Sequence, residues 1–124
     1  MKTLFIFLFL TIVAFAQTQP AMYFCEDYSG GEVGVGCTFS PGTITVMVRC
    51  DHNIGISNAT IQFDRWENGN WNFYKQFSFM INKDGNYFFF KRNDLVIQTP
   101  GFYRCYLLNK SRQVISSAIV EIVK

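Results

Sequence analysis

Alternation of apolar and polar residues with a period of two runs through most of this sequence, and it restricts the fold more than any other feature. In the segment TITVMVRC, from position 43 to 50, Ile44, Val46, Val48 and Cys50 fall on one side of an extended chain. After the first sixteen residues no segment keeps a helical period, and turn residues recur roughly every ten positions. The pattern predicts an all-β protein, an antiparallel β-sandwich of about seven to eight strands.

Three turn signals predict hairpins between these strands. Asn68-Gly69 stands between TIQFDRW, which ends at Trp66, and WNFYKQFSF; the favoured two-residue turn needs positive φ at both central positions. Asp84-Gly85 repeats the signal before YFFFKR, and the polar KSR joins FYRCYLLN to QVISSAIVEIV. In WNFYKQFSF the residues Trp71, Phe73, Phe77 and Phe79 share one parity, so we expect them on the buried face.

The first sixteen residues have the pattern of a secretory signal peptide. Lys2 precedes an uncharged apolar run that ends in Ala14-Phe15-Ala16, and this run is shorter than the roughly 20 residues that a membrane-spanning helix needs. We therefore expect residues 1–16 to be removed and residues 17–124 to form a single secreted, extracellular domain without a membrane span. Within it, residues 17–42 are a glycine-rich N-terminal segment.

All four cysteines, Cys25, Cys37, Cys50 and Cys105, lie in the expected mature chain and would enter an oxidising compartment. Parity places Cys50 and Cys105 on the inner side of their strands, where a bridge between them would join two sheets and contribute about 4 kcal/mol. Cys25 and Cys37 would then close a local loop in the N-terminal segment. Four cysteines allow three pairings, so this connectivity is an inference.

No residue pattern points to catalysis, a metal site or a cofactor. The only histidine, His52, stands alone in a polar turn, and no nucleophile, phosphate-loop or zinc-protease motif occurs. Eleven Lys and Arg balance nine Asp and Glu without a basic cluster, which argues against a nucleic-acid partner. We expect a protein that is not an enzyme.

Two segments resemble strands of an immunoglobulin-type domain, over roughly Pro41 to Val123. PGTITVMVRC resembles the second strand of that family with its first core cysteine, and GFYRCYL resembles the sixth strand with its G-x-Y-x-C pattern. The resemblance implies an immunoglobulin-like sandwich in which Tyr103 forms a structural corner, its hydroxyl bonding to the chain a few residues upstream. Phe63 stands where the family's core tryptophan is expected, and Thr99 replaces a common acidic residue.

Aromatic residues make up 18% of the chain, more than one small core readily absorbs. The outward sides of two expected neighbouring strands carry Asp64, Trp66, Arg104 and Tyr106, together with Leu108. Such a mixture is typical of a recognition surface, although the glycine-rich segment could instead cover some aromatic residues. We expect a binding module for another extracellular protein or cell-surface component, with a homodimer as one arrangement; the alternative is a binder or carrier of a sugar or lipid.

Two sequons for N-linked glycosylation fall in expected loops. They are Asn58-Ala59-Thr60 and Asn109-Lys110-Ser111. In a secreted eukaryotic chain we expect at least one of them to be used.

Overall fold

A computed structural model describes residues 19–124, and in this part of the chain every regular element is a strand. The predicted signal peptide, residues 1–16, lies outside the described residues. The strands are β1 (Ala21–Cys25), β2 (Asp27–Tyr28), β3 (Glu32–Val33), β4 (Thr38–Phe39), β5 (Gly42–Thr43), β6 (Thr45–Arg49), β7 (Asn58–Glu67), β8 (Asn70–Met80), β9 (Tyr87–Phe90), β10 (Val96–Ile97), β11 (Gly101–Leu108) and β12 (Val114–Ile122). Five of these twelve have only two residues. Of the other seven, all except β1 lie in segments for which the sequence predicts a strand.

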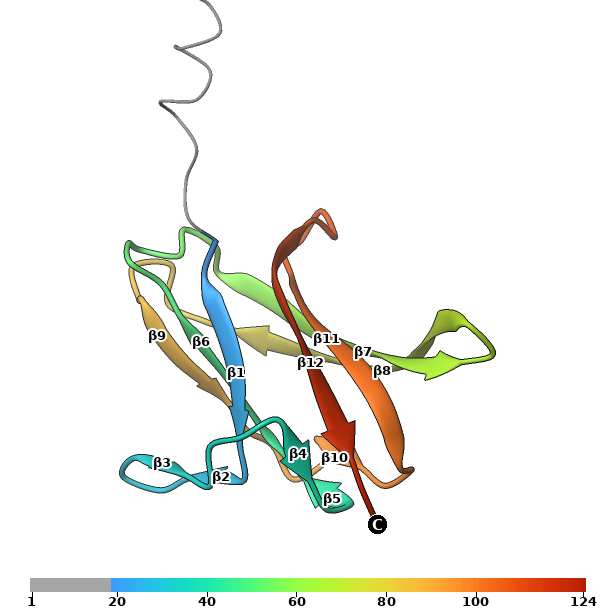
Figure 1. Ribbon diagram of the computed structural model, residues 1–124. Coiled ribbons are helices and arrows are strands. Elements are labelled where there is room, and N and C mark those ends of the chain that lie inside the picture. The colour runs from blue at the N-terminus through green and yellow to red at the C-terminus, as the bar shows by residue number, and fades with distance from the viewer. Residues whose placement is uncertain (1–18) are drawn as a thin grey trace, which may run out of the picture.

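Two sheets form the layers of a β-sandwich, which confirms the predicted fold class (Figure 1). The larger sheet has the strand order β4-β12-β11-β7-β8, and the smaller has the order β1-β6-β9. All neighbours in both sheets are antiparallel except β4, which pairs in parallel with β12. The ladders β5–β10 and β2–β3 lie beside them.

Two of the three predicted hairpins are present. Asn68 and Gly69 have φ values of 53° and 80° in the turn between β7 and β8, and the polar segment after Leu108 joins β11 to β12. The hairpin predicted at Asp84-Gly85 is wrong, because β8 belongs to the larger sheet and β9 pairs with β6 in the smaller one. The turn at Gly85 therefore belongs to a crossing between the two layers.

A β-bulge in β8 reverses the faces of its aromatic residues. Phe63 of β7 pairs with Lys75, whereas the next residue, Asp64, pairs with Phe73, so Tyr74 is the extra residue. Because an inserted residue shifts the period of two, Phe73 lies on the outer face and is 61% exposed, while Phe77 is buried. The prediction that these residues share the buried face is therefore correct for Phe77 and Phe79, which follow the bulge. It is wrong for Trp71 and Phe73, which precede the bulge and lie on the outer side.

The core lies between the two sheets and consists of aliphatic and aromatic side chains from both. Phe63 is fully buried, as predicted, and its ring meets the ring of Phe77 edge-on at 6.4 Å. Phe79 packs in the same way against Phe90 of the smaller sheet, with 5.0 Å between the ring centroids. The phenylalanine side chains thus fill the space between the layers by packing on one another.

Cys50 and Cys105 both lie in this core, as their parity predicts, but the predicted disulfide is absent and both are free thiols. Cys105 lies in the middle of β11, opposite Phe63, whereas Cys50 follows the last residue of β6 and its amide donates to the carbonyl of Asn86. Burial raises the pKa of each thiol, so both are protonated at neutral pH.

The local disulfide between Cys25 and Cys37 is also absent, and the register of the chain gives the reason. Phe24 bridges Gly36 in antiparallel fashion, so Cys25 and Cys37 lie diagonally rather than opposite each other. Diagonal neighbours are about 7–8 Å apart, beyond the usual span of a disulfide. Cys25 is fully buried, with its Sγ 3.2 Å from the carbonyl oxygen of Asp27, while Cys37 is exposed.

The glycine-rich segment from Glu26 to Gly36 forms a flap over the outer face of the smaller sheet. The carboxylate of Glu32 accepts hydrogen bonds from the hydroxyls of Tyr23 and Tyr87, and the ring of Tyr28 stacks on Phe89 at 4.2 Å. Met47, which lies on the outer side of this sheet by parity, is fully buried. The flap therefore covers apolar side chains that the sheet alone would expose.

Candidate recognition surface

The outward side chains of β12, β11, β7 and β8 form a continuous surface, which we call the outer face. One row across it runs through residues that are directly paired: Ile119 with Arg104, Arg104 with Asp64, and Asp64 with Phe73. The next row contains Ser117, Tyr106, Gln62 and Gln76. The structure thus brings Asp64, Arg104 and Tyr106 together, as the sequence predicts.

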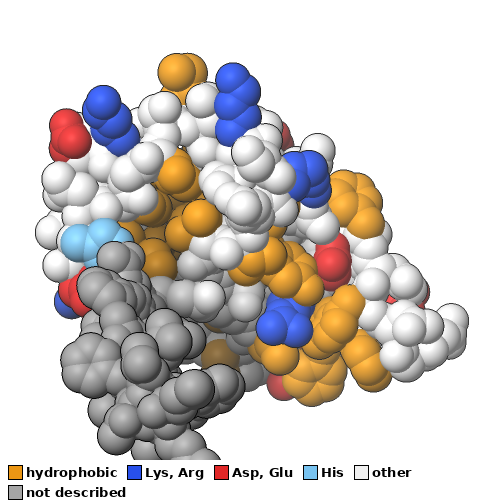
Figure 2. Space-filling model, turned by 90° about the horizontal axis from the view of Figure 1, so that it is seen from above, with side chains coloured by type: hydrophobic (Ala, Val, Ile, Leu, Met, Phe, Trp, Pro, Cys, Tyr) orange, Lys and Arg blue, Asp and Glu red, His pale blue; other side chains and the backbone are white. Residues whose placement is uncertain are grey.

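Large apolar side chains are exposed on this face. Trp66 is 46% exposed, Phe102 50%, Ile119 52% and Phe73 61%. Trp66 also meets Trp71 edge-on, at 5.1 Å, beside the β7–β8 turn. Seen from above the view of Figure 1, hydrophobic side chains gather at the surface around one basic side chain (Figure 2). Grouped exposure of this kind marks interaction surfaces more often than scattered single residues do.

Sequence reasoning missed part of this surface and overstated the exposure of one residue. Phe73 was missed because no sequence signal gave the position of the bulge in β8. Ile119 was missed because the parity of β12 becomes clear only from its pairing with β11. Leu108, expected on the outer side, pairs with Thr60 of that side but is only 5% exposed, so it adds little to the surface.

Arg104 has unused hydrogen-bonding capacity at the centre of the outer face. Its guanidinium carbon lies 5.5 Å from the centre of the Tyr106 ring, and in residues 19–124 its buried Nε has no hydrogen-bond partner. Asp64 lies directly opposite, but its Oδ1 accepts from Nε2 of Gln62 at 2.9 Å, and the ion pairs of the described chain do not include Arg104. A buried donor left without an acceptor costs free energy in the folded protein.

Arg112 reaches the same face from the β11–β12 turn. It has a positive φ of 62°, an uncommon conformation for a residue with a side chain. Its Nη2 donates to Oε1 of Gln62 at 2.5 Å, and Nη1 lies 3.4 Å from Oε1 of Gln76. The turn thereby holds the guanidinium group of Arg112 over strands β7 and β8, as a second positive charge on the outer face besides Arg104.

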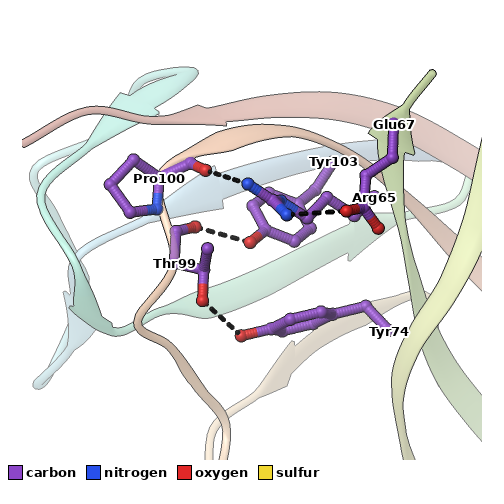
Figure 3. Close-up of polar contacts among 6 residues, drawn as sticks. All are labelled: Arg65, Glu67, Tyr74, Thr99, Pro100 and Tyr103. Atoms are coloured by element: carbon purple, nitrogen blue, oxygen red, sulfur yellow. Dashed lines mark hydrogen bonds and ion pairs between the residues drawn. The ribbon is translucent and has the colours of Figure 1, made fainter. Parts of the chain in front are cut away.

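Tyr103 lies on the inner side of the same sheet and fixes the chain that leads into β11. It is fully buried, and its hydroxyl donates to the carbonyl oxygen of Thr99 at 2.5 Å (Figure 3). Its ring meets Tyr74 at 5.0 Å, and Nη2 of Arg65 donates to the carbonyl of Pro100 at 2.9 Å. Burial raises the pKa of Tyr103 to about 12. The predicted structural corner is therefore formed.

The two predicted glycosylation sites lie together at one end of the sandwich. Asn58 and Asn109 line the same open hollow of about 440 Å³ and a smaller one of about 250 Å³ beside it. Asn58 is exposed at the start of β7, whereas Asn109 is half-buried. Within the described part of the chain, no three His, Cys, Asp or Glu side chains group as a metal site, and no helix is long and apolar enough to cross a membrane.

Comparisons of this chain with protein-family models, with curated proteins and with solved structures found no match in any of the three.

Proposed function

We propose that this protein is a secreted, immunoglobulin-like binding module without catalytic activity, which recognises another extracellular protein through the outer face. The immunoglobulin-like part of the proposal is supported by the Tyr103 corner and by Phe63 opposite Cys105. Secretion rests on the apolar sequence that ends at Ala16.

The observation that carries the proposal is the composition of the outer face. Exposed aromatic residues surround Arg104, and aromatic residues and arginine are the types that most often dominate the energy of protein interfaces. The flap buries Met47 of the smaller sheet but leaves Tyr87 and Phe89 of that sheet 38% and 49% exposed. The outer face carries a more exposed group, Trp66, Phe73, Phe102 and Ile119. The packed phenylalanine core favours protein recognition over a carrier that holds a lipid between its sheets.

Paired surface variants test this proposal. Phe73→Ser combined with Phe102→Ser removes two exposed side chains of the outer face, and Val33→Ser combined with Val35→Ser removes two exposed side chains of the flap as a matched control. We expect the first variant to bind cells from the source organism at least tenfold more weakly, because aromatic residues at an interface centre contribute about 2 kcal/mol each. The flap variant should bind like the wild type.

Trp66→Ala combined with Tyr106→Ala is a second outer-face variant with the same expected loss. Equal binding by both outer-face variants and the wild type, at unchanged circular dichroism, would show that the face is assigned wrongly. Sedimentation of the same proteins shows whether the partner is a second copy of this chain or a different protein. A wild-type dimer that the outer-face variants dissociate identifies a second copy as the partner.

A further inference from the structure

The hollow at the end of the sandwich has the features of a seat for a sugar ring. Its lining includes Met80, which is 86% exposed and lies directly opposite Asn58 in the β7–β8 ladder. Lys110 and Arg112 stand on the same lining as hydrogen-bond donors. An exposed apolar side chain with polar donors beside it suits a pyranose ring, which has an apolar C–H face and a rim of hydroxyl groups.

The two sequon asparagines differ in their local bonding. Asn109 is tied into the β11–β12 turn: its Nδ2 donates to Oε1 of Gln113 and its Oδ1 accepts from the amide of Gln113, each at 2.9 Å. Asn58 is exposed at the first position of β7, beside Met80. The side-chain amide of Asn109 is therefore already used in hydrogen bonds that stabilise the turn. Asn58 is the asparagine whose side chain is placed to carry a substituent over the hollow.

We infer that Asn58 carries an N-linked glycan whose first sugar rings lie in this hollow and cover Met80. The inference rests on the secretion that the proposed function includes. In the transfer, Nδ2 of Asn58 attacks C1 of the first sugar of a lipid-diphosphate-linked oligosaccharide and gives up one proton. The bond between C1 and the phosphate oxygen breaks, and the lipid diphosphate leaves with its electron pair.

This glycan gives Met80 an apolar neighbour from outside the polypeptide. A methionine exposed to this extent gains stability when apolar surface is removed from water, so the attached sugar stabilises the folded state. It also places the carbohydrate at the Asn58–Met80 end of the outer face, away from Asp64 and its partner Arg104 further along the same strands.

The first arm of the test is the mass of the full chain secreted by cultured animal cells, before and after enzymatic removal of N-linked glycans. We expect one glycan on the wild type, none on Asn58→Gln, and one on Ser111→Ala, which destroys the second sequon without touching the hydrogen bonds of Asn109. A secreted wild type with bare Asn58, or a Ser111→Ala variant that loses the glycan, overturns the inference. Failure of secretion counts against the proposed function instead.

The second arm asks whether the sugar contacts Met80. The glycan is trimmed to its first N-acetylglucosamine, and the melting temperature is compared with that of the fully deglycosylated protein. We expect the sugar to raise the melting temperature by about 4 °C, the shift that about 1 kcal/mol of added stability gives in a domain of this size. In Met80→Ser the sugar should give no increase. The same increase in both proteins would show that the sugar lies elsewhere.

Discussion

Replacing Tyr103 by phenylalanine removes one hydroxyl group and leaves the buried ring in place. The lost hydrogen bond joins that hydroxyl to the carbonyl oxygen of Thr99 at 2.5 Å, across the turn that leads into β11. Thr99 is exposed, so its carbonyl can bind water after the substitution, and the loss should be that of one net hydrogen bond. We expect the free energy of unfolding to fall by about 1 kcal/mol and the melting temperature by about 4–8 °C.

Two further variants provide a lower and an upper reference for this loss of stability. Tyr74→Phe is the matched control, because the Tyr74 hydroxyl lies 3.5 Å from Oγ1 of Thr99, too far for a strong hydrogen bond, and we expect a loss below about 0.5 kcal/mol. Tyr103→Ala removes the ring as well and should cost about 3–5 kcal/mol. Urea unfolding followed by circular dichroism measures all three. If Tyr103→Phe has the same urea midpoint as the wild type, or unfolds as easily as Tyr103→Ala, the hydroxyl does not contribute the single hydrogen bond assigned to it in the structural corner.

The other predictions concern the bulge in β8 and the ionisation of Tyr103. Phe77→Ala should cost about 3–5 kcal/mol and Phe73→Ala less than about 0.5 kcal/mol in urea unfolding, because the bulge buries the first residue and exposes the second; comparable losses would contradict the register. Burial raises the pKa of Tyr103 from 10.0 to about 12, so this residue's contribution is complete below pH 10 and is lost as the pH rises through 12. Wild-type stability should therefore fall by roughly 3 kcal/mol more than that of Tyr103→Phe over this range, and parallel pH curves would refute the assignment.

The sequence predicts the parts of this fold that depend on local patterns. Alternation gives the strands and the inward orientation of Cys50 and Cys105, and the need for positive φ gives the turn at Asn68-Gly69. The turn at Gly85 has similar residues but lies between two sheets, because the pairing of β9 with β6 depends on contacts distant in the sequence. A local signal cannot distinguish a hairpin from a crossing.

The candidate surface is predictable in part, for the same reason. Asp64, Arg104 and Tyr106 are neighbours because parity and the pairing of β7 with β11 agree. Phe73 joins them only through the extra residue at Tyr74. The ring of Tyr74 packs on Tyr103, a residue distant in the sequence, and no local pattern contains that contact. The missing disulfide between Cys25 and Cys37 likewise depends on a diagonal register that spacing alone does not give.

The flap makes the two broad surfaces of the molecule unlike each other. With Glu32 held by two tyrosines and Met47 sealed beneath it, one broad surface is occupied by the chain's own N-terminal part and the opposite one stays available. The flap side still exposes Val33, Val35 and Phe89 by 47%, 58% and 49%, so both broad surfaces carry apolar side chains. They differ in what they present: folded-back N-terminal chain on one, and the bare strands of the larger sheet on the other.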